Sequence, residues 1–160
     1  MQTASIRKMV LAAMLAALCC VATLVIQVPI PGGGYVNLGD AVVLLCGWLL
    51  GPAYGCAAAG IGSALADLLS GYSIYAPGTL VIKAGMALLV CIPLWGKFRW
   101  MSALSAELWM VTGYFLYGLI LGQGAAASAA GIPGNLIQGA MGMVFALAAY
   151  TFLKRTPLVK

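Results

Sequence analysis

Histidine is absent from this sequence of 160 residues, and only three acidic residues stand against eight Lys and Arg. Without histidine, neither a Ser-His-Asp triad nor a Cys-His pair can form, and the imidazole ligand of most catalytic metal sites is missing. The pattern G-x-x-x-x-G-K-[ST], whose loop cradles the phosphates of ATP, does not occur either. The three acids do not share one predicted helix or face, which disfavours a membrane-embedded acid–base enzyme. The sequence therefore predicts no catalytic residue, no metal site and no cofactor.

Charged residues of both signs make up only 7% of the chain, whereas hydrophobic residues make up 64% and the mean hydropathy is +1.07. A soluble domain carries about 25% charged residues. This composition cannot cover a surface that faces water, so the chain is predicted to be an integral membrane protein. We expect one membrane domain, residues 1–160, and no separate soluble domain.

Apolar runs broken by proline, glycine and charge predict an all-α bundle of six transmembrane helices. Their ranges are 5–27, 38–50, 53–70, 79–95, 101–123 and 133–153. The second run is short, and only Gly51 and Pro52 divide it from the third. A count of five spans with a re-entrant second segment therefore stays open.

The basic residues predict the orientation of the bundle. The loops 28–37, 71–78 and 124–132 contain no charged residue and would all lie on one side. The opposite side is the cytoplasm by the positive-inside rule, so both termini are expected there. With six spans, the basic residues on that side are Arg7, Lys8, Lys97, Arg99, Lys154, Arg155 and Lys160.

Polar residues inside a bilayer are costly and usually face a cavity or a partner. In the predicted topology, Asp40 begins the second helix, Asp67 nears the end of the third, and Lys83 lies about one turn into the fourth. Asn135 and Gln138 open the sixth helix three residues apart, and so share one helical face. All five lie in the outer half, which predicts a small-molecule pocket open to the outside. Its walls would be aromatic, from Tyr35, Tyr72, Tyr75 and Tyr117.

Several of these residues also have a purely structural interpretation, which the sequence leaves open. Asn37 and Asp40 fit a helix cap followed by an acid in the first turn. Asn135 and Gln138 could hydrogen-bond between helices without touching a ligand. The tyrosines near the outer boundary, Tyr72 above all, fit an interfacial belt.

The remaining charges are expected to form ion pairs. Asp67 and Lys83 would either neutralise each other across neighbouring helices, because an unpaired buried charge is costly, or contact the ligand; the sequence leaves this open. Glu107, at the inner start of the fifth helix, would pair with basic residues on the cytoplasmic side.

Two patterns of small residues are notable. Gly32, Gly33 and Gly34 permit unusual backbone angles, so their loop would either gate the pocket or serve as a plain connection. On the first helix, small residues repeat at four-residue spacing, which marks a surface where helices approach closely. These residues are Ala12 and Ala16, with Ala13 and Ala17 beside them.

Four motifs then follow one another along the chain. They are Gly34-Tyr-Val-Asn-Leu-Gly-Asp40, Gly51-Pro-Ala-Tyr-Gly55, Gly62-Ser-Ala-Leu-Ala-Asp67-Leu-Leu-Ser-Gly-Tyr72 and Tyr75-Ala-Pro-Gly-Thr-Leu-Val-Ile-Lys83. Taken in order, they resemble the substrate-binding S components of energy-coupling factor (ECF) vitamin transporters. The resemblance is to the branch for riboflavin, hydroxymethylpyrimidine and pyridoxine uptake, and it extends over essentially the whole chain.

The resemblance implies a six-helix bundle in a bacterial plasma membrane that captures a vitamin or precursor from outside. It also implies two kinds of partner, a membrane scaffold (the T component) and two cytoplasmic ATPases. The family's A-x-x-x-A pattern, which docks helix one onto the scaffold, maps onto Ala12 and Ala16 or, in the neighbouring register, onto Ala13 and Ala17. The family's substrate contacts come from the first outer loop and the outer parts of the later helices, which here points to Tyr35, Asn37, Asp40, Lys83, Asn135 and Gln138.

The ligand is the least determined part of this interpretation, since S components share a fold while binding different vitamins. With Tyr75 and Tyr117 added, the expected site offers amides and tyrosines but no excess of positive charge. A small neutral heteroaromatic alcohol, such as hydroxymethylpyrimidine or pyridoxine, suits it better than a polyanion. The alternative function is a stand-alone small secondary transporter or channel, although no inverted repeat is evident.

Overall fold

The computed structural model describes residues 2–31, 34–92 and 98–155. Within these ranges the chain forms six long helices, one short helix and a hairpin of two-residue strands, so the fold is all-helical as the sequence predicts. In chain order the elements are α1 (Gln2–Val25), β1 (Val28–Pro29), β2 (Tyr35–Val36), α2 (Gly39–Leu50), α3 (Pro52–Leu69), α4 (Ala76–Leu89), α5 (Arg99–Ile120), α6 (Ala125–Ala130) and α7 (Ile132–Leu153).

The long helices lie near the expected apolar runs, but some of their ends differ. α4 begins at Ala76 rather than at residue 79, because Pro77 occupies the first turn, where its missing N–H needs no partner. The expected end of this helix, at residue 95, lies outside the described residues. Two elements were not expected from sequence: the hairpin of β1 and β2 in the loop 28–37, and α6 in the loop 124–132.

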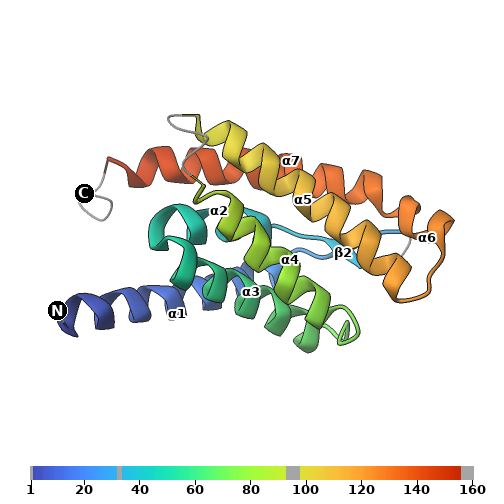
Figure 1. Cartoon of the computed structure of the whole chain (residues 1–160), viewed down its shortest axis with the longest axis horizontal. Coiled ribbons are helices and arrows are strands. Elements are labelled where there is room, and N and C mark those ends of the chain that lie inside the picture. Colours follow the sequence, from blue (N-terminus) through green and yellow to red (C-terminus); the bar gives the residue numbers. More distant parts are fainter. Residues whose placement is uncertain (1, 32–33, 93–97, 156–160) are drawn as a thin grey trace.

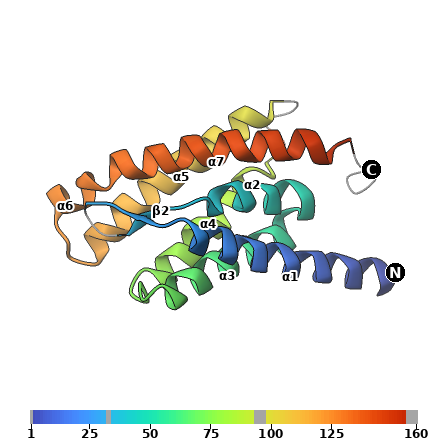
Figure 2. The same ribbon diagram turned by 180° about the vertical axis from the view of Figure 1, so that it is seen from behind.

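α2 is the central helix of the bundle. It packs against α1, α3, α4 and α7, and most of its residues are buried. α3 packs between α1 and α4, and α5 packs between α4 and α7. Figure 1 and Figure 2 show the start of α1 and the end of α7 at one end of the bundle and α6 at the other.

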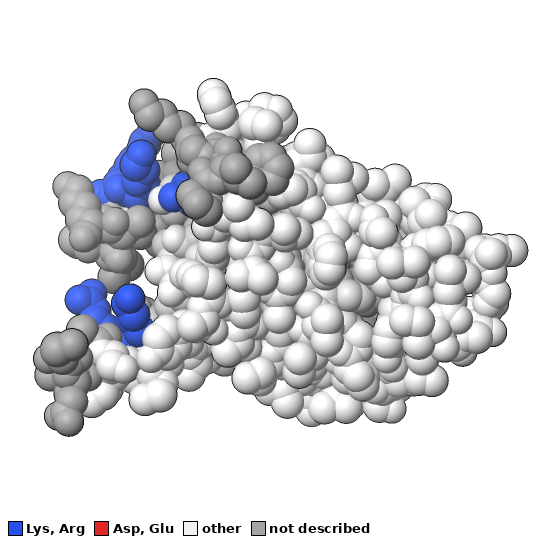
Figure 3. Space-filling view, in the orientation of Figure 1, with Lys and Arg blue, Asp and Glu red and all other residues white. Residues whose placement is uncertain are grey.

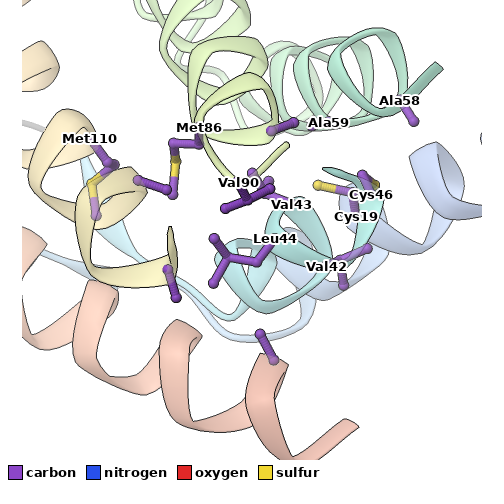
Figure 4. Packing of buried hydrophobic residues seen from close by; sticks show 14 of the residues in the cluster. Cys19, Val42, Val43, Leu44, Cys46, Ala58, Ala59, Met86, Val90 and Met110 are labelled. Carbon is purple, nitrogen blue, oxygen red and sulfur yellow. The ribbon is translucent and has the colours of Figure 1, made fainter. Parts of the chain in front are cut away.

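A buried apolar cluster surrounds α2. Leu44 of α2, Met86 of α4 and Met110 of α5 belong to it, and each has 0% of its surface exposed. Figure 4 shows Leu44 beside Val43 and Val90, with Met86 and Met110 to one side. Lipid is as apolar as these side chains, so the cluster stabilises the bundle through close packing rather than through removal of apolar surface from water.

Helix lengths divide the described elements into two groups. Three segments are long and apolar enough to cross a membrane, namely Ser5–Val25, Arg99–Ile120 and Ala125–Leu153. α2 has 12 residues and, at about 1.5 Å per residue, extends for about 18 Å, less than the roughly 30 Å of a hydrocarbon core. The short second segment is therefore a helix enclosed by its neighbours rather than by lipid.

Close approach between α1 and α3 depends on Gly62. A Cβ atom at Gly62 would lie 2.4 Å from the backbone oxygen of Ala16. We expect Gly62→Ala to lower the free energy of unfolding by about 1–3 kcal/mol, as overpacking does, because backbone cannot rotate away. Gly113→Ala is the matched control, since its Cβ would meet the Ile82 side chain at 2.9 Å. Thermal unfolding in detergent compares the two variants, and equal losses would contradict the backbone contact.

The exposed basic residues gather at one end of the bundle. Figure 3 shows Lys and Arg only at the end where α1 begins and α7 ends, and the rest of the visible described surface carries no charge. Arg99, at the start of α5, packs its guanidinium 3.8 Å from the centre of the Tyr150 ring. Lys97 and Lys160, which the sequence places on the same side, lie outside the described residues.

Candidate functional site

A cavity of about 50 Å³ lies at the opposite end of the bundle, near α6. Its walls come from the hairpin, the turn between α3 and α4, α5, and the segment from α6 to the start of α7. Ile30 of the hairpin covers part of it and packs against α7, where a Cβ at Gly134 would lie 2.6 Å from the Ile30 side chain. Of the expected gating loop, Gly34 is described, with a φ of 86°, and Gly32 and Gly33 are not.

Five of the eight residues predicted to bind substrate line this cavity. They are Tyr35, Asn37, Tyr75, Asn135 and Gln138. Asp40, Lys83 and Tyr117 are not part of its wall. Tyr117 instead packs its ring against Gly78 and donates a hydrogen bond of 2.9 Å from its hydroxyl to the carbonyl oxygen of Ile74.

Tyrosine rings form one side of the cavity. The ring centres of Tyr35 and Tyr72 are 4.9 Å apart, and those of Tyr72 and Tyr75 are 6.2 Å apart, both in tilted arrangements. The amide of Gln123 donates a hydrogen bond to the hydroxyl of Tyr75. Tyr72, for which the sequence offers both a place in the pocket wall and an interfacial belt, lines the cavity.

Gln138 forms the floor of the cavity and is 2% exposed. Its Oε1 accepts hydrogen bonds from the backbone N–H of Asn37, at 3.0 Å, and from Asn37 Nδ2, at 3.2 Å. Its Nε2 donates to Asp40 Oδ2 at 2.7 Å. Asn37 Oδ1 in turn accepts the N–H of Gly39 at 2.8 Å. These bonds join the loop before α2 to α7 and fix the orientation of both amides.

Beneath the floor, Asp40 forms an ion pair with Lys83. Asp40 is 0% exposed and Lys83 3% exposed, and Lys83 Nζ also lies 5.4 Å from the centre of the Tyr114 ring. The expectation that Lys83 pairs with Asp67 is therefore wrong. Asp67 instead accepts a hydrogen bond of 2.7 Å from the hydroxyl of Tyr35.

The hydroxyl of Tyr35 is held in its protonated, donating form. Burial, followed by the hydrogen bond to Asp67, raises the pKa of Tyr35 well above its ordinary value. One carboxylate oxygen of Asp67 is therefore engaged. The other oxygen, Oδ2, is buried and has no hydrogen-bond partner within the described part of the chain.

Sequence reasoning missed several polar residues of the wall. Thr79 and Tyr114 face each other across α4 and α5, with their hydroxyl oxygens 3.1 Å apart. Ser128 stands on α6 and is 6% exposed. It is the single polar residue in the run Ala-Ala-Ala-Ser-Ala-Ala. This pattern would have indicated a polar site residue if the segment had been predicted as a helix.

Comparison with known proteins assigns this architecture to a family. The sequence model of the family described as "ECF-type riboflavin transporter, S component" matches residues 3–155. The chain belongs to this S-component family. Its members are membrane transporter subunits and not enzymes.

Two curated relatives and one solved structure resemble this S component. The "Thiamine precursor transporter HmpT" of Lactococcus lactis subsp. cremoris is 31% identical, and the match covers 99% of the chain and 95% of that protein. An uncharacterized protein of Pyrococcus woesei ("Uncharacterized protein in gap 3'region") is 33% identical, with 78% and 86% covered. The S component of a bacterial ECF transporter is similar in fold, with a TM-score of 0.70, 23% identity and 94% and 99% coverage.

The alanine stripe of α1, which consists of Ala12, Ala13, Ala16 and Ala17, is divided between two faces of the helix. Ala12 and Ala16 are half-buried and pack against the apolar core, and the backbone of Ala16 lies against Gly62. Ala13 and Ala17 are exposed. Of the two registers that the sequence left open, the one that contains Ala13 and Ala17 faces away from the bundle.

Glu107 lies deeper in the bundle than the sequence suggests. It is 5% exposed, and neither carboxylate oxygen has a hydrogen-bond partner among the described residues. Its carboxylate faces α7, where a Cβ at Gly139 or Gly142 would lie 3.1 Å from one of its oxygens. The expected pairing is not found with any of the described basic residues, because Glu107 lies two turns inside α5 and points toward α7.

Proposed function

We propose that the chain is the substrate-binding membrane subunit of an ECF-type importer for a vitamin precursor. It would capture hydroxymethylpyrimidine or pyridoxine from outside and deliver it to a T component and two cytoplasmic ATPases. The observation that carries this proposal is the cavity itself, walled by tyrosines and floored by the fixed amides of Asn37 and Gln138. The name of the L. lactis relative points to the same class of ligand.

The proposed topology has six spans with both termini in the cytoplasm. The exposed basic residues gather at one end of the bundle and the cavity lies at the other. The positive-inside rule assigns the basic end to the cytoplasm. The cavity then opens toward the outside, as a binding subunit of an importer requires.

The cavity favours a small uncharged or weakly basic ring over a large or anionic vitamin. Its volume of about 50 Å³ is small for a ligand site, which favours a single ring over the three fused rings of riboflavin. Among the described residues, the buried cation near the cavity is Lys83, which is paired with Asp40 beneath the floor and is not part of the cavity wall. An anionic ligand would therefore meet no counter-charge among the described wall residues.

A thermal-shift screen of the detergent-purified chain tests this function. The compounds are hydroxymethylpyrimidine, pyridoxine, riboflavin, thiamine, pantothenate and niacin. A ligand that binds only the folded state stabilises it by about 2.7 kcal/mol at a hundredfold excess over its Kd. We expect this shift with hydroxymethylpyrimidine or pyridoxine in the absence of any partner subunit. No shift with any of the six would contradict the proposal.

Asn135 provides a test of the site within the same assay. It is 9% exposed and lines the cavity at the start of α7. Removal of one hydrogen-bonding amide weakens binding by about tenfold, so we expect Asn135→Ala to raise the Kd by that factor with little change in stability. Leu136→Ala, one residue along the same helix at an exposed position, is the matched control. Unchanged affinity in Asn135→Ala would exclude this residue from the site.

A further inference from the structure

Most polar atoms on the cavity wall already have partners. Both ends of the Asn37 and Gln138 amides are occupied. The hydroxyl of Tyr75 is bonded to Gln123, and that of Tyr35 to Asp67. Of the buried wall atoms within the described ranges, two have no hydrogen-bond partner, namely Asp67 Oδ2 and Ser128 Oγ.

Asp67 Oδ2 requires a donor from the ligand. An ionised carboxylate only accepts hydrogen bonds, and burial of one without a partner is costly. Tyr35 occupies the other oxygen, at 2.7 Å. The Thr79 hydroxyl also interacts with this carboxylate, and its oxygen lies 3.1 Å from the Tyr114 hydroxyl, so it is shared between the two groups. Lys83 could have supplied charge, but it pairs with Asp40. Within the described wall, the Asp67 carboxylate is therefore the acidic acceptor to which a ligand can add a donor.

The tyrosines narrow the kind of donor that suits this acceptor. Tyr35, Tyr72 and Tyr75 turn tilted rings toward one another along the cavity. Aromatic faces attract positively polarised groups. A flat ring whose amino group is conjugated to a ring nitrogen carries such polarity and supplies an N–H donor in the ring plane. A hydroxymethyl group also supplies a donor, but that donor is not conjugated to the ring.

We propose that Asp67 is a specificity-determining residue whose Oδ2 accepts an N–H from an aminoheterocycle. Ser128, on the α6 side of the same cavity, supplies a hydroxyl to a second polar atom of that ligand. The inference rests on the proposed function and narrows it, because it selects an amino-substituted pyrimidine over pyridoxine, which has hydroxyl donors but no amino group.

The role of Asp67 is tested by measuring the affinities of two ligands for the wild type and for one variant. The ligands are hydroxymethylpyrimidine and an analogue in which hydrogen replaces the amino group. Calorimetry on the purified chain and on Asp67→Asn gives four affinities. Asparagine keeps an oxygen for the Tyr35 hydroxyl and turns an amide N–H₂ toward the cavity, so the ligand's donor loses its acceptor. A hydrogen bond to a charged group corresponds to at least about tenfold in affinity.

We expect the wild type to prefer the amino ligand by about tenfold or more and Asp67→Asn to lose this preference. Glu107→Gln is the matched control, since it makes the same change of acid to amide at a buried residue outside the cavity. It should keep the preference. The comparison of the two ligands on the wild type does not depend on the folding of any variant.

Three results would overturn the inference. One is equal affinity of the wild type for both pyrimidines, and another is an equal loss for both ligands in a folded Asp67→Asn. The third is tighter binding of pyridoxine than of the aminopyrimidine, which would leave the proposed function intact while removing the role of Asp67. If the wild type binds none of the vitamins in the screen, the proposed function fails, and the inference fails with it.

Discussion

Lys83→Met is expected to lower the free energy of unfolding by about 3–5 kcal/mol, the usual result when one partner of a buried ion pair is removed. Asp40 is 0% exposed and accepts hydrogen bonds from Lys83 and Gln138. Methionine fills a similar volume and leaves the carboxylate without a counter-charge. The loss should appear as a large fall in thermal unfolding temperature in detergent.

The double variant Lys83→Met, Asp40→Asn separates loss of charge balance from loss of packing. Asparagine can still accept the hydrogen bond from Gln138 while carrying no charge, so we expect the double variant to recover most of the stability. Ligand binding should be retained in the double variant, because Gln138 keeps its hydrogen-bond partner beneath the cavity floor. If the double variant is as unstable as Lys83→Met, the cost comes from packing and the ion-pair argument fails.

Ala17→Trp is expected to abolish vitamin uptake while leaving ligand binding by the isolated subunit unchanged. Ala17 is exposed on α1 and does not belong to the apolar core. A large ring at this position would hold apart two helices that meet through small residues. Uptake of radiolabelled ligand by cells that produce the complete transporter measures the first effect, and calorimetry on the purified subunit measures the second.

Two control variants define the face that docks. Ala148→Trp places the same ring on an exposed alanine of α7, away from the stripe, and should preserve uptake. Ala16→Trp should disturb the subunit itself, because Ala16 packs on the core and its backbone contacts Gly62. Normal uptake by Ala17→Trp would refute the assignment of this register to the T component.

The sequence predicts the helices well because apolar runs and prolines act locally. The run 38–50 became α2 with a shift of one residue at its start, and the expected start of the third helix at residue 53 became Pro52. α6 was missed because six residues of mostly alanine carry little periodicity. Short apolar elements of this kind are decided by their tertiary surroundings.

The partners of the buried charges could not be predicted, because they depend on how each helix is rotated about its axis. Successive residues on a helix point about 100° apart, and α1 is apolar on all sides, so its sequence does not show which face is inward. The registers Ala12–Ala16 and Ala13–Ala17 are therefore equivalent in the sequence, and the structure distinguishes them by packing Ala12 and Ala16 against the core. From the sequence, Lys83 could pair with Asp67 or with Asp40. It pairs with Asp40 because α2 lies at the centre of the bundle and packs against α4.

The central position of α2 also determines the order in which its contacts can form during synthesis. α2 is synthesised early. The two hydrogen-bond partners of its Asp40 carboxylate come later in the chain: Lys83 follows after 43 residues, and Gln138 follows after 98 residues. Until α4 and α7 emerge, α2 carries an acid that lacks both of its partners in the folded bundle. The cavity is thus completed almost last, because Asn135 and Gln138 of α7 supply part of its lining.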